Sequence, residues 1–153
     1  MSSPRRDSGF TLIELLVTIT LLGVLMAISV SGWSSWSKAR QQSGTASELT
    51  STLRQTQQRA VTEGTAMCVT FTNITYTVSR GSCTSSAPLA ANRVAGPVPA
   101  GRGVSIASGA FPVGVTFTAR GTSTDGSVTV TRTGSTKVYT LRVEGFTGRV
   151  SLA

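Results

Sequence analysis

The sequence predicts an α+β protein in which a long N-terminal helix, membrane-spanning in its first half, packs on a C-terminal antiparallel β-sheet head. Three features support this prediction. Residues 10–30 form an almost wholly apolar run, and residues 38–63 contain no proline, a single glycine and many helix-favouring residues. Beyond Gly64, short runs of Val, Thr, Phe, Tyr and Ile alternate with Gly, Asn, Ser and Pro, which is typical of strands and turns.

The apolar run holds 21 residues from Phe10 to Val30 and a single ionisable group, Glu14. At about 1.5 Å per residue, a helix of this length covers a bilayer core of roughly 30 Å. A carboxylate at mid-membrane costs about 2.5–3.5 kcal/mol on insertion scales, so we expect Glu14 to lie near an interface or to meet a partner. The alternative explanation is a capping box in which Thr11 and Glu14 start the helix.

The apolar run could also be read as a secretory signal peptide, but it is longer than a typical one and ends without a small-x-small cleavage site. We therefore expect the run to stay in the product. Trp33 and Trp36 follow it, with Lys38 and Arg40 just beyond. This order fits an aromatic belt at the headgroup level, while a core or subunit contact for the two tryptophans is the alternative.

The residues around Glu14 resemble the cleavage and methylation signature of type IV prepilins and type II secretion pseudopilins. Residues 9–17 read GFTLIELLV, after a short leader that contains Arg5 and Arg6. The resemblance implies that a prepilin peptidase cuts after Gly9 and that the new amine of Phe10 is methylated. It also implies that Glu14 faces the Phe10 amine of a neighbouring subunit and acts in assembly.

This resemblance sets the expected domains and their location. We expect a leader peptide at residues 1–9, a transmembrane helix at 10–33, an amphipathic continuation of the helix at 34–63 and a β-rich head at 64–153. The leader would lie in the cytoplasm. The chain would cross the cytoplasmic (inner) membrane once, with the head outside the cytoplasm, and later enter a cell-envelope filament.

The second half of the helix carries a weak apolar stripe, with loosening expected near Gly32 and Gly44 and a C-cap at Gly64. The stripe comprises Ala46, Leu49, Leu53, Thr56, Ala60 and Val61. In the head, we expect a hairpin of strands 67–72 and 74–79, then a long surface excursion at 81–112 with a short strand at 104–107. Further strands are expected at 113–119, 127–132 and 138–143, with an edge strand at 148–152.

The composition argues against enzymatic chemistry. The chain has no histidine and two single cysteines, so neither a zinc site nor a Cys-His nucleophile can be assembled, and no cofactor is expected. Cys68 and Cys83 either form a disulfide in a head outside the cytoplasm or remain two free thiols buried in strands. A disulfide across a loop of about 15 residues contributes roughly 3 kcal/mol.

The net charge is +8, and residues 80–153 carry eight basic against two acidic side chains. Such an excess favours nucleic acid, anionic lipid or acidic protein partners, although scattered surface arginines are its commoner meaning. Arg120, Arg132, Arg142 and Arg149 could form a phosphate-binding patch on the last sheet. We expect the nearby aromatic residues Phe117, Tyr139 and Phe146 to lie in the core.

Several segments of the second half of the helix and of the head resemble the GspH/FimT group of minor pilins and pseudopilins. They are Leu49-x3-Leu53, residues 58–61 (QRAV), 113–121 with Phe117, 125–130 (DGSVTV) and 147–150 (TGRV). The resemblance implies a long helix packed on a β-rich head. It also implies one of two roles, a structural filament subunit or a FimT-like receptor that captures DNA for transformation through a Gly-Arg-x-Arg motif. Here Ser151 stands in place of the second arginine, which removes one phosphate contact.

We therefore expect a non-enzymatic minor subunit of a type II secretion pseudopilus or type IV pilus, with DNA uptake as the alternative. The expected partners are other pilin or pseudopilin subunits, the prepilin peptidase and the membrane. DNA and a secreted protein cargo are further candidates.

Overall fold

The computed structural model describes residues 10–84, 90–109, 111 and 113–153, without the side chains of residues 29–35 and 90. The predicted leader at residues 1–9, including Gly9, lies outside the described residues. The chain divides into two compact units, Met1–Ser37 and Lys38–Ala153, and each is described by itself.

Helix α1 runs from Leu12 to Thr62 without a break at Gly32 or Gly44, and the loosening expected near these glycines stays a prediction. At its start, the Glu14 backbone N–H donates to the Thr11 hydroxyl oxygen at 3.3 Å, which caps the first turn. The large apolar side chains between Phe10 and Ile28 are 48–84% exposed. The apolar side chains of this segment are therefore about half exposed or more within their own unit.

No helix within the described part of the chain is both long and apolar enough to cross a membrane. The predicted span at residues 10–33 includes residues 29–33, whose side chains lie outside that part.

The end of α1 is a Schellman motif centred on Gly64. Gly64 has φ +61°, in the left-handed region that favours glycine. The Thr65 N–H donates to the Ala60 carbonyl at 3.1 Å, and the Gly64 N–H donates to the Val61 carbonyl at 3.3 Å. The predicted C-cap is thus confirmed.

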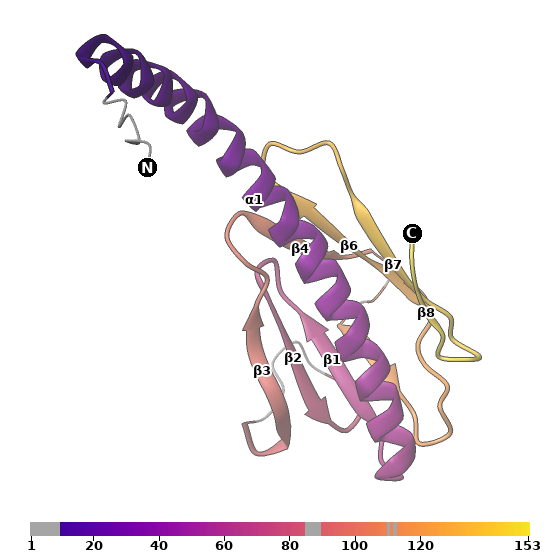
Figure 1. The fold of residues 1–153 in the computed structure, drawn as a ribbon. Helices are drawn as coiled ribbons and strands as arrows, with labels where there is room; N and C mark the ends of the chain where they lie inside the picture. The colour runs from indigo at the N-terminus through magenta and orange to yellow at the C-terminus, as the bar shows by residue number, and fades with distance from the viewer. Residues whose placement is uncertain (1–9, 85–89, 110, 112) are drawn as a thin grey trace, which may run out of the picture. The chain divides into compact units, whose positions relative to one another are not determined.

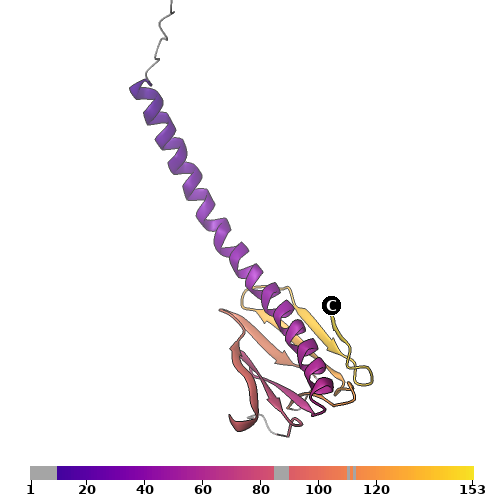
Figure 2. The ribbon, with the colours of Figure 1, turned by 60° about the horizontal axis from the view of Figure 1, so that its bottom comes forward.

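Two antiparallel four-stranded sheets make up the described part of the head, in the orders β3-β2-β1-β5 and β4-β6-β7-β8. Figures 1 and 2 show α1, from residue 38 onward, lying across strands of both sheets. The strands are β1 (Met67–Phe71), β2 (Thr75–Arg80), β3 (Arg93–Pro99), β4 (Val104–Ser108), β5 (Gly114–Phe117), β6 (Gly126–Arg132), β7 (Tyr139–Val143) and β8 (Val150–Leu152). The β1–β2 hairpin and the edge position of β8 were both predicted and are confirmed.

The predicted antiparallel pairing of the head is confirmed, and the strands divide between two sheets, because β5 pairs with β1 and so joins the first sheet, while β6 and β7 lie in the second. One prediction about the head is wrong. We expected residues 81–112 to be mainly irregular, yet they contain strand β3 as well as the predicted strand β4. β3 tolerates Pro97 and Pro99 because it is an edge strand that pairs with β2 alone, through a register broken by two shifts.

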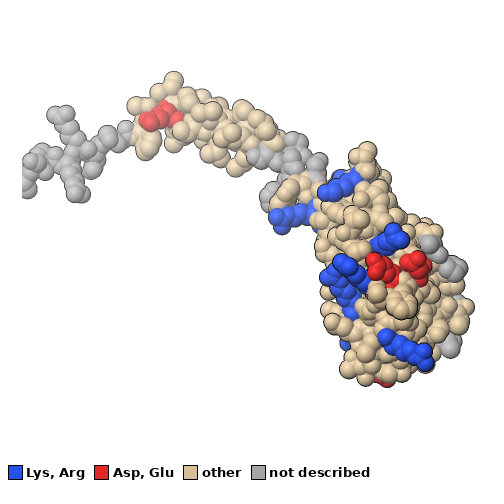
Figure 3. All heavy atoms as spheres, turned by 90° about the vertical axis from the view of Figure 1, so that its right-hand side faces the viewer, with Lys and Arg blue, Asp and Glu red and all other residues tan. Residues whose placement is uncertain are grey.

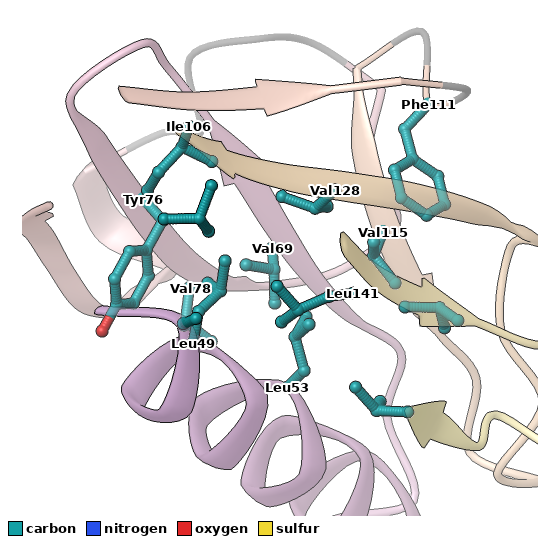
Figure 4. Packing of buried hydrophobic residues seen from close by; sticks show 14 of the residues in the cluster. Leu49, Leu53, Val69, Tyr76, Val78, Ile106, Phe111, Val115, Val128 and Leu141 are labelled. Atoms are coloured by element: carbon teal, nitrogen blue, oxygen red, sulfur yellow. The ribbon is translucent and has the colours of Figure 1, made fainter. Parts of the chain in front are cut away.

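The core lies between the helix and the two sheets, as Figure 4 shows. Leu49 and Leu53 are fully buried and reach Val69 of the first sheet and Leu141 of the second. Val61, which the stripe prediction included, is instead 52% exposed. One residue is about 100° of helix rotation, so Val61 turns away from the side on which its neighbour Ala60 is buried.

Candidate functional site

The predicted assembly residues lie at the start of the first unit. Phe10 is 81% exposed and lies two residues before the first residue of the helix, and Glu14 lies in the first turn of α1 with its side chain exposed. A carboxylate in this turn is favourably placed toward the positive end of the helix dipole. Such a carboxylate can accept hydrogen bonds from an ammonium group on another molecule. Gly9, the other processing residue, lies outside the described residues.

Trp36, the second of the two tryptophans that follow the apolar run, is 51% exposed. The side chain of Trp33 lies outside the described residues. The predicted aromatic belt therefore stays a prediction.

The four predicted DNA-binding arginines do not form one patch. Arg132 ends β6 on the side of the strand that Val128 and Val130 bury, whereas Arg142 projects from the opposite, exposed face of β7. Arg149 precedes β8, beside the β6 end that starts at Gly126. About six strand steps, roughly 20 Å, separate that end from Arg132. The face in Figure 3 shows basic side chains at separate places, with a small acidic group between them.

The loop between β7 and β8 is anchored to the helix by an amide. Gln57 Nε2 donates to the Gly121 carbonyl at 2.9 Å and to the Thr147 carbonyl at 3.0 Å. Gly148 has φ +65°, and a Cβ at this position would meet Gln57 Nε2 and the Gly121 oxygen. The glycine of the Gly148-Arg149 sequence is therefore required for close packing of the loop on the helix.

The anchored loop presents Phe146 and Arg149 to solvent, together with the exposed Glu144 and Thr147. Phe146 is 92% exposed, so its predicted core position is wrong. Arg149 is also exposed, and its backbone N–H donates to the Thr147 hydroxyl oxygen at 3.2 Å. Phe146 lies between two glycines in a turn, where no strand alternation directs its side chain inward. The loop is thus a candidate contact surface that combines an aromatic ring with a cation.

The other two aromatic residues behave largely as expected. Phe117 is fully buried in the core. Tyr139 is partly buried against the core cluster, and the Lys137 ammonium lies 4.9 Å from its ring centroid. Such a cation–π contact contributes about 0.5–1 kcal/mol at an exposed site.

Tyr76 connects the first sheet to the helix. Its hydroxyl donates to Glu48 Oε1 at 2.9 Å. The pKa of the phenol is raised, and burial of the side chain is the main cause. The Thr52 hydroxyl lies 3.4 Å away and opposes this shift, whereas Glu48 adds to it. The three side chains line a pocket between α1 and strands β2 and β3, and we interpret their hydrogen bonds as a structural contact that joins the helix to the first sheet.

Cys68 of β1 and Cys83 form a disulfide with a Cα–Cα distance of 5.1 Å. The bridge ties the first sheet to the chain that leaves β2. Among the residues that the structure describes, no group of three His, Cys, Asp or Glu side chains could hold a metal ion.

Sequence reasoning missed the two glutamines that hold loops of the head. Gln42 is 2% exposed, and its Nε2 donates to the backbone oxygens of Val130 and Lys137 at 3.1 and 2.7 Å. Gln57 has the corresponding role at the β7–β8 loop. Gln42 precedes Ala46 by one helical turn, so extending the stripe by a turn would have found it.

Two family models match the chain, one at its N-terminal segment and one over the second half of the helix and the head. Residues 4–30 match the prokaryotic N-terminal methylation motif, and residues 45–148 match the family described as type II transport protein GspH. The chain belongs to the GspH family. It is thus a minor pilin or pseudopilin of a type II secretion or type IV pilus system, a class of structural, non-enzymatic proteins. Its methylation motif implies processing by a peptidase, assembly with pilins and residence in the inner membrane or a pilus.

Solved structures share the fold of this GspH-family chain at low sequence identity. The type IV minor pilin FimU of Pseudomonas aeruginosa is 20% identical, with a TM-score of 0.61 over 77% of this chain and 92% of that one. A second FimU crystal structure has 22% identity and a TM-score of 0.52, covering 72% and 91%. The minor pseudopilin EpsH of the Vibrio cholerae type 2 secretion system has 12% identity and a TM-score of 0.56, covering 74% and 96%. No curated protein sequence matched the chain.

Proposed function

We propose that the chain is a structural subunit of its filament, assembled through the segment that starts at Phe10. The observation that carries this proposal is the contrast between the two units. The head has a closed core of fully buried side chains, whereas the apolar residues from Phe10 to Ile28 are exposed within their own unit. Such a segment needs an apolar environment, which a membrane supplies before assembly and neighbouring helices supply afterwards.

The single ionisable side chain between Phe10 and Val30, Glu14, sets the position of each subunit in this proposal. The prepilin peptidase cleaves after Gly9, and the methylated amine of Phe10 remains a cation. Glu14 of one subunit receives the Phe10 amine of its neighbour. In an apolar bundle, an unpaired carboxylate is costly, so the pairing selects one axial offset between subunits.

The location of the precursor follows from the same proposal. Residues 10–33 cross the inner membrane once, with the leader in the cytoplasm and the head outside. The disulfide between Cys68 and Cys83 supports this orientation, because such bonds persist in oxidising compartments.

The test is the incorporation of Glu14→Ala into filaments. Glu63→Ala is the matched control, since Glu63 is an acid next to the end of the same helix whose exposed ion pair with Arg80 contributes little to stability. We expect both variants to be inserted and cleaved like the wild type, while Glu14→Ala alone is depleted from sheared filaments. Incorporation of Glu14→Ala at the wild-type level would refute the assembly role.

A second candidate function is DNA capture, favoured by the exposed pair of Phe146 and Arg149 on the β7–β8 loop. An aromatic ring can stack on a base while the guanidinium contacts a phosphate. Binding of duplex and single-stranded DNA to the detergent-solubilised chain should then weaken steeply with salt. Arg149→Ala should reduce it, whereas Arg93→Ala, an exposed arginine on β3, should not. Absence of binding at low salt would exclude this function.

A further inference from the structure

Five basic residues surround the beginning of the second unit, where the chain enters the head. Lys38 and Arg40 lie on α1 at the first residues of the unit. Arg102 lies in the turn between β3 and β4, Arg132 ends β6, and Lys137 precedes β7. We call these five residues the basic collar.

The loop between β6 and β7 is held against α1 at this end of the head. Gln42 Nε2 donates to the Val130 and Lys137 carbonyl oxygens at 3.1 and 2.7 Å. Lys38 lies one helical turn before Gln42 and therefore on the same side of the helix. Lys38, Lys137 and the end of β6 are thus neighbours around the helix.

The turn that carries Arg102 closes the collar on another side. The Thr45 hydroxyl donates to the Ala100 carbonyl at 2.7 Å, which joins the start of this turn to α1. The Thr133 N–H donates to the Gly103 carbonyl at 3.0 Å, which joins its end to the β6–β7 loop. Arg102 lies between these two attachments and is exposed.

The four acidic residues of the second unit lie elsewhere. Glu48 accepts the Tyr76 hydroxyl beside the first sheet, and Glu63 pairs with Arg80 just beyond the last turn of α1. Asp125 precedes β6 and Glu144 follows β7, and these two positions lie at the end of the second sheet opposite Arg132. The collar is therefore a region of concentrated positive charge.

We propose that the basic collar binds the anionic headgroups of phospholipids in the membrane that holds the precursor. This inference rests on the proposed function, in which residues 10–33 lie in that membrane. Lys38 follows Val30 by eight positions in the sequence, so the collar begins shortly after the segment that the proposed function places in the membrane. Lysine and arginine side chains are long and can extend their charged ends toward lipid headgroups.

Two further features support a lipid surface as the partner. Val138 follows Lys137 and is 49% exposed, which places an aliphatic group beside the cations. In addition, basic residues next to a membrane segment are ordinarily concentrated on the cytoplasmic side, whereas the proposed orientation puts these outside. A gain from anionic lipid explains why a membrane-adjacent surface keeps five cations there.

The test measures lipid selectivity of the full-length chain reconstituted in vesicles of phosphatidylcholine and phosphatidylglycerol. Spin-labelled lipids of each type report their relative association with the protein. The collar variant replaces its exposed members, Lys38→Gln, Arg40→Gln, Arg102→Gln and Lys137→Gln. The matched control changes the charge equally at exposed sites outside the collar, Arg59→Gln, Arg93→Gln, Arg120→Gln and Arg149→Gln. Resistance of both variants to thiol labelling without reduction checks that they fold.

A basic residue near an anionic surface strengthens association roughly five-fold. We therefore expect the wild type and the control to prefer phosphatidylglycerol at least about five-fold at low salt, and the collar variant to show a preference near one. The same lipid preference in the wild type and the collar variant would overturn the inference. If that variant also failed to enter filaments, the collar would instead contact a neighbouring protein. Failure of the wild type to associate with vesicles of phosphatidylcholine alone would instead contradict the proposed membrane-held precursor.

Discussion

Truncating Leu53 tests whether the second half of α1 is part of the core of the head. Leu53 is fully buried between α1 and the two sheets, while Val61, about two turns later on the same helix, is 52% exposed. Leucine-to-alanine changes at buried sites cost about 2–5 kcal/mol, because they remove apolar contact and leave a cavity. Val61→Ala should change the free energy of unfolding by less than about 0.5 kcal/mol.

The assay is thermal unfolding of the purified chain in mild detergent, followed by near-ultraviolet circular dichroism with the disulfide intact. For a domain of about 100 residues, 1 kcal/mol shifts the Tm by roughly 4 °C. A loss of about 3 kcal/mol should therefore lower the Tm of Leu53→Ala by about 12 °C, against about 2 °C or less for Val61→Ala. Equal shifts for the two variants would refute the packing of this face of the helix on the two sheets.

Three further predictions concern the head alone. Replacing Cys68 and Cys83 by serine should cost roughly 3 kcal/mol of stability in thermal unfolding, and thiol reagents should label the wild type only after reduction; labelling without reduction would contradict the disulfide. Gly148→Ala should cost about 1–3 kcal/mol because of its positive φ, and normal stability of this variant would show that the β7–β8 loop does not depend on Gln57. Since burial raises the pKa of Tyr76, the folded state favours the neutral phenol, so stability should hold below about pH 10 and fall above it; in Tyr76→Phe this fall should be smaller.

Much of the fold could be predicted because its signals are local. Leu49 and Leu53 repeat at the helical period and are buried together, and Gly64 is the residue type that a Schellman motif requires. The β1–β2 hairpin follows from two adjacent strand-like runs around Asn73. Each of these features depends on residues close together in the chain.

The division of the strands between two sheets could not be read from the sequence. β5 pairs with β1, which lies more than forty residues earlier, and no local pattern specifies such a partner. β3 was missed because Pro97 and Pro99 are usually absent from strands, and their tolerance depends on the edge position that the sheet order creates.

The candidate sites also differ in whether their signal is local in the sequence or depends on contacts between distant segments. Glu14 stands out from sequence because a single acid interrupts an apolar run. The arginine patch did not form, because strand alternation and register put Arg132 and Arg142 on different faces. The basic collar joins residues up to 99 positions apart, through backbone contacts made by Gln42 and Thr45. Only the folded head brings them together.

Mass spectrometry of the chain recovered from sheared filaments tests the proposed processing and assembly most directly. We expect an N-terminal peptide that begins at Phe10 and carries one added methyl group on its amine. Recovery from filaments of a chain that still begins at Met1 would contradict the proposed processing and assembly through Phe10 and Glu14.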